Sequence, residues 1–162
     1  GPQGQVYALE PAPENAAAAW GSTETLVSPF KAAAAASGRG RLQLVDDRSW
    51  SKLEGYGEHP GTERVLEVEL VAIDELVEHG DLRPPSLVKI DVEGAELSVL
   101  EGLRATLERH RPAVICELHG TQREFAAFMA DQGYRVINLE GPLPVDEDPA
   151  AEHALALPVT LS

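Results

Sequence analysis

The sequence predicts an α/β domain with a mostly parallel sheet, and three observations lead to that prediction. Short apolar segments typical of buried strands alternate along the chain with amphipathic segments typical of helices. The chain has 162 residues, a length that suits a single domain. Hydrophobic residues make up 43 % of the sequence, which is enough to fill a core and excludes wholesale disorder.

The first half of the chain predicts strands and one helix separated by turns. Glycine, proline and serine residues mark where these elements end. The alanine run Ala32–Ala36 favours a helix over disorder, and the polar residues 46–63 predict an excursion on the surface. The expected elements are a strand at Gln5–Leu9 that ends at Glu10, a helix from Glu14 to Trp20 closed by Gly21 and Ser22, a strand at Thr25–Pro29, a turn at Ser37–Gly40 and a strand at Arg41–Val45.

The second half alternates strands and helices more regularly. A leucine stripe with spacings of three and four residues, from Leu97 to Leu107, predicts one helix that Pro112 ends. The other expected elements are strands at Val65–Leu70, Ser86–Ile90, Ala113–Cys116, Tyr134–Leu139 and Ala154–Leu161, a helix at Ile73–His79 stopped by Gly80, and a helix from Thr121 to about Gln132 with a capping box of Thr121 and Glu124.

Charge and composition disfavour several classes of function. The 13 basic and 27 acidic residues give a formal charge of −14, which repels phosphate backbones and argues against binding to nucleic acid. The longest apolar stretches, such as Ala32–Ala36, are far shorter than the roughly 20 residues of a membrane helix, so no membrane partner is expected. The single cysteine, Cys116, allows no disulfide within the chain and predicts a reducing, cytoplasmic setting.

Ionisable residues follow three of the predicted strands. Glu10 ends the first, Asp91 follows Ser86–Ile90, and Glu117 with His119 follows Ala113–Cys116. Ligands of parallel α/β sheets bind beyond the carboxyl ends of the strands. The sequence therefore predicts that these side chains gather around one pocket, and this convergence is its main functional signal.

Each of these acids also has a simpler explanation. Glu10 can hold the vicinal hydroxyls of a ribose, or it can be a solvated loop acid. Asp91, Glu93 and Glu96 are three acids within six residues that repel one another and are costly to desolvate together. The positive end of the following helix is a sufficient explanation for Glu96. For Asp91, a functional role and a role without function are equally well supported.

His119 is a candidate general base, because an imidazole held by a nearby carboxylate accepts protons near neutral pH. Glu117 lies two residues before it and points to the same face if the strand continues. The alternative is a partly exposed loop histidine with no chemical role. The other four histidines, His153 among them, are expected at the surface.

A metal centre is a minority alternative. Asp91, Glu93, Glu117 and His119 could supply ligands to Mg²⁺, which prefers hard oxygen donors. No spacing among them is diagnostic, so the sequence assigns no metal ligands. The motifs of serine hydrolases, P-loop proteins, zinc proteases and CxxC redox proteins do not occur in the chain.

Four segments together resemble the FkbM-type methyltransferases, and the likeness runs with gaps from about Gln5 to Leu139. The KIDVEGAE block followed by a leucine helix and the RP…E.H strand are specific in combination, whereas the first segment alone is a weak signal. The segments are VYALEPAPEN (Val6–Asn15), AIDEL (Ala72–Leu76), VKIDVEGAELSVLEGL (Val88–Leu103) and RPAVICELH (Arg111–His119).

The resemblance implies a Rossmann-like class I fold and an S-adenosylmethionine-dependent methyltransferase. Most enzymes of this family are O-methyltransferases, so the expected acceptor is a hydroxyl of a small molecule or sugar. It places Glu10 on the adenosyl ribose, Ser37 near the adenine, and Asp91 beside the methionine and the methyl-transfer region. Glu117 and His119 then face the acceptor, and His119 or Asp91 is the expected base.

The chain departs from the family pattern at its start. The family opens with a strand and a D-x-G-A-x-x-G loop that approaches the cofactor, and the sequence before Val6 offers no counterpart. The resemblance therefore predicts that residues 1–162 form a partial methyltransferase domain that lacks its first, central strand. A non-catalytic α/β remnant or interaction domain stays open as an alternative, and the sequence predicts no oligomeric state.

Overall fold

The structure is a computed structural model, and it describes residues 4–20, 25–29, 31–44, 51–56, 62 and 64–159. The helix end predicted at Gly21 and Ser22, the last residues of the strand predicted at Ala154–Leu161, and most of the polar segment 46–63 lie outside these residues. Among the described residues, no helix combines the length and hydrophobicity that crossing a bilayer requires.

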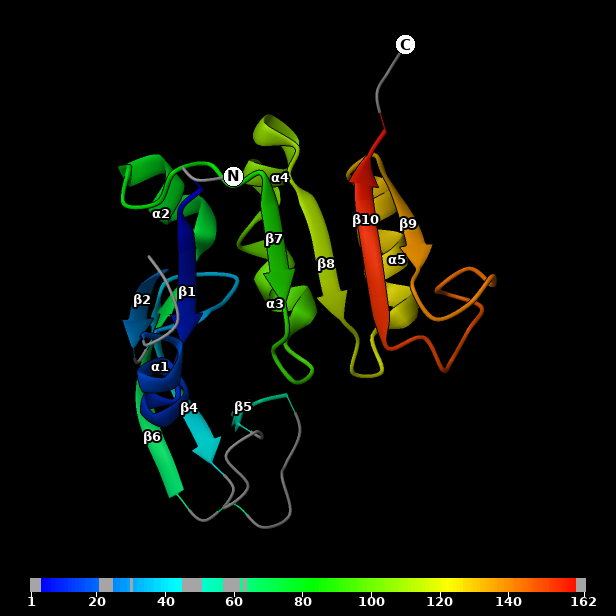
Figure 1. Cartoon of the computed structure of the whole chain (residues 1–162). Coiled ribbons are helices and arrows are strands. Elements are labelled where there is room, and N and C mark those ends of the chain that lie inside the picture. The colour runs from blue at the N-terminus through cyan, green and yellow to red at the C-terminus, as the bar shows by residue number, and fades with distance from the viewer. Residues whose placement is uncertain are drawn as a thin grey trace.

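The described strands form three sheets (Figure 1). The smallest pairs β1 (Val6–Glu10) with β2 (Thr25–Pro29) in parallel. The second has the order β3 (Lys31–Ala33), β6 (Arg64–Val71), β4 (Gly38–Leu44), β5 (Ser51–Leu53). The third has the order β7 (Leu87–Ile90), β8 (Ala113–Glu117), β10 (His153–Pro158), β9 (Tyr134–Asn138).

These sheets are mixed, which corrects the expected mostly parallel sheet. β7 and β8 are parallel, but β10 lies antiparallel to both of its neighbours, β8 and β9. β4 likewise pairs antiparallel with β5 and β6. Strands that follow each other without an intervening helix can pair antiparallel, whereas parallel neighbours need a crossover connection. Within the described residues, no helix separates β9 from β10 or β4 from β5.

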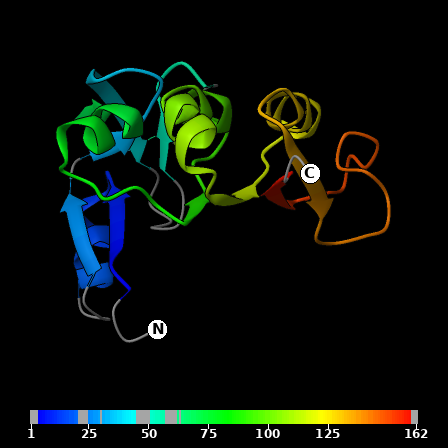
Figure 2. The same ribbon diagram turned by 90° about the horizontal axis from the view of Figure 1, so that it is seen from above.

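The helices are α1 (Pro13–Trp20), α2 (Ile73–His79), α3 (Glu96–Glu101), α4 (Arg104–His110) and α5 (Gln122–Asp131). Viewed from above, α3, α4 and α5 lie on the same face of the sheet β7-β8-β10-β9 (Figure 2). The predicted end of α2 is confirmed, because Gly80 adopts a left-handed conformation with φ 80° and donates its N–H to Val77 O.

The leucine stripe forms two helices, not the one helix that its spacing predicts. Gly102 and Leu103 separate α3 from α4. A Cβ atom at Gly102 would overlap the carbonyl oxygen of Ala34, so the chain packs against a neighbouring backbone at this point. Asp74 then caps α4, accepting the N–H groups of Ala105 at 2.8 Å and Thr106 at 2.7 Å.

Three further predictions about the first half differ from the structure. The alanine run begins in strand β3, and Ala32 is buried because β3 pairs in parallel with β6. The turn predicted at Ser37–Gly40 lies earlier in the chain, with bends at residues 35–37, and β4 already begins at Gly38. Strand β5 also lies inside the segment predicted as a surface excursion. Pairing with other strands decides all three, and local composition does not report it.

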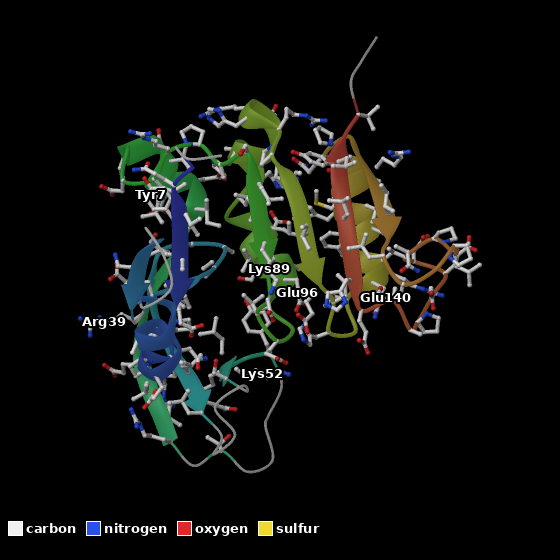
Figure 3. All side chains as sticks on the ribbon, viewed as in Figure 1. Tyr7, Arg39, Lys52, Lys89, Glu96 and Glu140 are labelled. Atoms are coloured by element: carbon white, nitrogen blue, oxygen red, sulfur yellow. The ribbon has the colours of Figure 1, made fainter. Side chains whose placement is uncertain are left out.

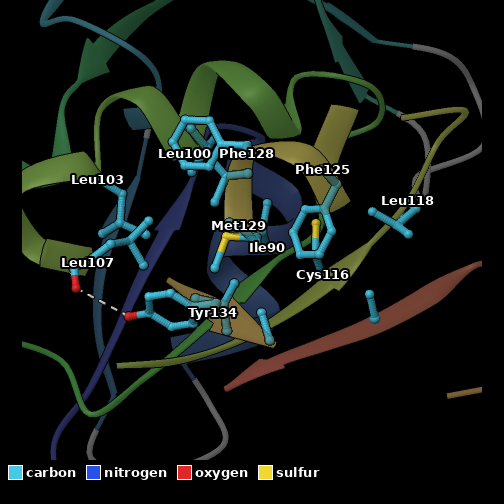
Figure 4. Packing of buried hydrophobic residues seen from close by; sticks show 14 of the residues in the cluster. Ile90, Leu100, Leu103, Leu107, Cys116, Leu118, Phe125, Phe128, Met129 and Tyr134 are labelled. Atoms are coloured by element: carbon cyan, nitrogen blue, oxygen red, sulfur yellow. Dashed lines mark hydrogen bonds between the residues drawn. The ribbon is translucent and has the colours of Figure 1, made fainter. Parts of the chain in front are cut away.

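The main core lies between the third sheet and its helices (Figure 4). Leu100, Leu103, Leu107 and Phe125 are fully buried there, as the helical spacing of the leucines predicts. The Tyr134 hydroxyl donates a hydrogen bond to Leu107 O at 3.3 Å. Cys116 is buried in the same core, and burial raises the pKa of its thiol.

Candidate functional site

The candidate site lies beyond the carboxyl ends of β7 and β8. Asp91 follows β7, Glu117 is the last residue of β8, and His119 comes two residues later. One ligand atom from each of these side chains lies within 4.8 Å of the other two. The structure thus brings together three groups that the sequence places at two strand ends.

Glu10 approaches the same edge of the fold from β1. Its Oε1 accepts the backbone N–H of Ala12 at 2.8 Å, which holds the carboxylate at the strand end. Burial raises the pKa of Glu10, and the nearby negative charge of Asp91 raises it further. Glu10 at the end of β1 is therefore near Asp91 after β7, although the two strands do not pair among the described residues.

Asp91 has a cationic partner that the sequence reasoning missed. Lys89 Nζ lies 2.8 Å from Asp91 Oδ2, and this hydrogen bond raises the pKa of Lys89. Both side chains are exposed, at 61 % and 41 %. Residues two apart along a strand share a face, so the K-x-D spacing was the available signal.

His119 is held by Glu96, a residue that the sequence reasoning treated only as a helix-terminus acid. Glu96 is fully buried, and its Oε1 lies 2.8 Å from His119 Nδ1 and 2.8 Å from the N–H of Gly94. The Thr121 hydroxyl donates to Glu96 Oε2 at 3.0 Å. Figure 3 shows Glu96 just beyond the lower end of β7.

The capping box predicted at Thr121 is absent. Thr121 is the residue before α5, but its side chain makes no capping hydrogen bond to that helix. Its hydroxyl is used by Glu96 instead, 25 residues earlier in the chain. A hydrogen bond to a buried carboxylate is stronger than a capping hydrogen bond at the surface. The tertiary contact of Thr121 with Glu96 therefore replaces the local capping motif.

A tight turn between β7 and α3 prepares the Glu96 site. Glu93 has φ 50° and Gly94 has φ 98°, both left-handed. This conformation is strained for Glu93, and such strain persists where surrounding contacts fix it. The turn directs the Gly94 N–H to Glu96 and leaves Glu93 Oε2 at 3.5 Å from His119 Nε2.

His153 lies beside the site, with its side chain 40 % exposed as predicted for a surface residue, but its contacts were not predicted. Its Nε2 lies 3.7 Å from Glu117 Oε2, and its Nδ1 lies 2.7 Å from Glu140 Oε1. Glu117 Oε1 is 3.8 Å from His119 Nε2, so Glu117 lies between two imidazoles. The backbone N–H of His153 lowers the pKa of Glu140. β10 brings His153 opposite Glu117, a register that only the strand order reveals.

Ser37 makes a different set of contacts. Its hydroxyl oxygen accepts the N–H of Ala72 at 3.2 Å, at the residue before α2. Its role near an adenine stays a prediction. A surface hollow of about 540 Å³ lies over α5 and β9, and none of its lining residues belongs to the strand-end cluster. The hydrogen-bonded cluster, and not this hollow, identifies the candidate site.

Comparison with known proteins gives consistent results. The family model for the methyltransferase FkbM domain matches residues 1–136. A hexuronic acid methyltransferase, AglP, from Haloferax volcanii is 40 % identical over 70 residues, which cover 43 % of this chain and 29 % of that protein.

The crystal structure of the methyltransferase FkbM from Methylobacillus flagellatus KT superposes with a TM-score of 0.56 at 18 % identity, which shows a shared fold. The match covers 94 % of this chain and 36 % of that one, so the chain spans about a third of the length of these relatives. The family match extends over the segment that carries Glu10, Asp91, Glu117 and His119, and the chain therefore belongs to the FkbM family of methyltransferases.

Proposed function

We propose that this domain takes part in S-adenosylmethionine-dependent methylation of a hydroxyl oxygen on a sugar or another small molecule. The observation that carries the proposal is the cluster of Asp91, Glu117 and His119 at the strand ends, with Glu10 on the same rim. Family membership supports methyl transfer. The name of the Haloferax relative supports a sugar acceptor.

The residues present fit the proposed cofactor. S-adenosylmethionine, when bound, supplies a methyl group carried on a positively charged sulfur. A carboxylate offers about four acceptor sites, and the Ala12 N–H uses one site of Glu10, so this side chain can also accept the two hydroxyls of a ribose. Asp91 and Glu117 favour a cationic group beside them by Coulomb attraction.

His119 has the geometry of the base. Its Nδ1 is occupied by Glu96, and its Nε2 has carboxylate oxygens of Glu93 and Glu117 at 3.5 Å and 3.8 Å. The His119 side chain is 25 % exposed, so an acceptor hydroxyl can reach it from solvent. His119 Nε2 then takes the proton that the hydroxyl loses as its oxygen is methylated.

The test is titration calorimetry with S-adenosylhomocysteine on the protein in its full natural length. We expect binding in the wild type and a loss of roughly tenfold or more in Glu10→Gln, because a hydrogen bond to a charged group contributes about 1.5–3 kcal/mol. Glu14→Gln is the matched control, since Glu14 is an exposed acid on α1, 3.8 Å from Arg64. Absence of binding in the wild type contradicts the proposal.

A metal-assisted form of the same reaction is a second candidate. Asp91, Glu117 and His119 can each offer one ligand atom, and the three atoms lie close enough to share an ion. A divalent cation there would lower the pKa of a bound hydroxyl. We expect Mg²⁺ or Mn²⁺ to raise the melting temperature of the wild type but not of Asp91→Asn; equal effects on both proteins exclude this candidate.

A further inference from the structure

Glu96 is the most deeply buried member of the site, and its contacts indicate its charge state. The side chain is fully buried. Its two oxygens meet the Gly94 N–H at 2.8 Å, the Thr121 hydroxyl at 3.0 Å and His119 Nδ1 at 2.8 Å. The Gly94 amide can only donate, and donors around both oxygens compensate an ionised carboxylate for its lost water.

This arrangement fixes which nitrogen of His119 carries the proton. A neutral imidazole has one N–H donor and one acceptor nitrogen, and the partner of one nitrogen selects the tautomer. With Glu96 as an ionised acceptor, the proton belongs on Nδ1. Nε2 then presents its lone pair toward Glu93 and Glu117.

Carboxylate oxygens alone would repel that lone pair. A hydroxyl that contacts Nε2 can instead donate its one hydrogen to that lone pair. The held tautomer is thus the one that accepts a proton from an acceptor hydroxyl, whereas the opposite tautomer would point an N–H at it.

We infer that Glu96 is a positioning residue that locks His119 in the Nδ1–H tautomer, so that Nε2 stands ready as the proton acceptor. This inference rests on the proposed function for the role of Nε2, but the lock itself can be measured without any ligand. Gly94 and Thr121 support the lock indirectly, by holding both oxygens of Glu96.

The experiment is two-bond ¹H–¹⁵N correlation spectroscopy of the imidazole rings at a pH where histidine is neutral. His119→Asn assigns the signal. We expect the wild type to show the Nδ1–H pattern for His119. Glu96→Gln removes the charged acceptor and offers an amide donor to Nδ1, so we expect loss of the Nδ1–H pattern. Thr121→Val keeps the carboxylate and is expected to retain it.

Asp74→Asn is the matched control. Asp74 is also a partly buried acid with three hydrogen bonds, to the N–H groups of Ala105 and Thr106 and to the Thr106 hydroxyl, but it serves α4 and not the site. We expect this variant to lose stability while the His119 signal keeps its wild-type pattern.

The outcomes separate this inference from the proposed function. An Nε2–H or averaged pattern for His119 in the wild type overturns the inference, and this measurement needs no variant to fold. An unchanged pattern in folded Glu96→Gln also overturns it. A wild type with the Nδ1–H pattern that fails to bind S-adenosylhomocysteine retains the lock and refutes the methyl-transfer proposal.

Discussion

Several acids of the site lie close together, and their negative charges repel one another. Glu10 and Asp91 approach from different strands, and their proximity together with burial raises the pKa of Glu10. Lys89 offsets the charge of Asp91 at 2.8 Å. Keeping Glu10 ionised at neutral pH therefore costs stability, which is typical of residues placed for binding.

Replacing Glu10 by Gln is expected to stabilise the chain at neutral pH. The folded chain binds the Glu10 proton more tightly than the unfolded chain, so this group makes stability fall as the pH rises from the ordinary pKa of 4.5 through the raised one. Glu10→Gln removes that loss. Urea unfolding at pH 7 should show a larger free energy of unfolding than the wild type, and little difference should remain well below pH 4.5.

Glu14→Gln serves as the control for this comparison, because Glu14 is an exposed acid of α1. We expect no gain in stability from it at pH 7. A Glu10→Gln protein that is less stable than the wild type at pH 7 would contradict the expected stabilisation.

Sequence reasoning about single residues found the acids but not all their partners. Glu10, Asp91, Glu117 and His119 stand out because each follows an apolar segment. Glu96 and Thr121 do not stand out in the sequence, because a position at a helix start is a sufficient local explanation for each. In the structure, Glu96 contacts His119 and Thr121, which lie 23 and 25 positions later in the chain.

Among the helices, the break between α3 and α4 shows how tertiary packing overrides a helical pattern. The leucine spacing continues across Gly102, and Leu103 is fully buried like its neighbours. The backbone nevertheless leaves the helix there, because Gly102 packs against the carbonyl of Ala34. Asp74 of α2 then supplies the cap from which α4 begins.

Gly102→Ala is expected to destabilise the protein strongly. The new Cβ would overlap the Ala34 carbonyl, and a backbone atom cannot move aside as a flexible side chain can. Overpacking of this kind costs about 2 kcal/mol. Thermal or urea unfolding of the variant measures the loss.

Gly38→Ala is the matched control, because a Cβ at Gly38 meets no atom within 4 Å. We expect a change of less than about 1 kcal/mol for it. Equal stabilities of the two variants would show that the contact at Gly102 is not tight.

Over the molecule as a whole, the formal charge of −14 is the dominant electrostatic feature. Ion pairs at the surface, such as Lys31 with Glu69 at 3.1 Å, each contribute about 0–1 kcal/mol and weaken with salt. Repulsion among the excess acids also weakens with salt, and that change stabilises the folded chain.

We expect the repulsion to outweigh the ion pairs. The melting temperature should therefore rise when NaCl increases from about 20 to 200 mM, a range over which the distance at which charges are screened shortens markedly. Differential scanning fluorimetry measures this change. A falling melting temperature would show that the ion pairs dominate.

Most of the helices and strands, and the acids at the strand ends, can be predicted from the amino-acid sequence without knowledge of the fold. Hydrophobic periodicity and turn residues act over a few neighbouring positions, so their signals survive in any short window. The resemblance of the segments around Asp91 and Glu117 further indicated the family, which the comparisons confirm.

The mixed sheet order, the break at Gly102 and the partners of the histidines follow instead from the packing of distant segments. β10 lies between β8 and β9, and this placement alone brings His153 opposite Glu117. Burial of Glu96 beneath His119 has the same origin. Such contacts depend on which distant segments share a sheet or a core, and that choice minimises the free energy of the whole chain, so no local window of sequence contains it.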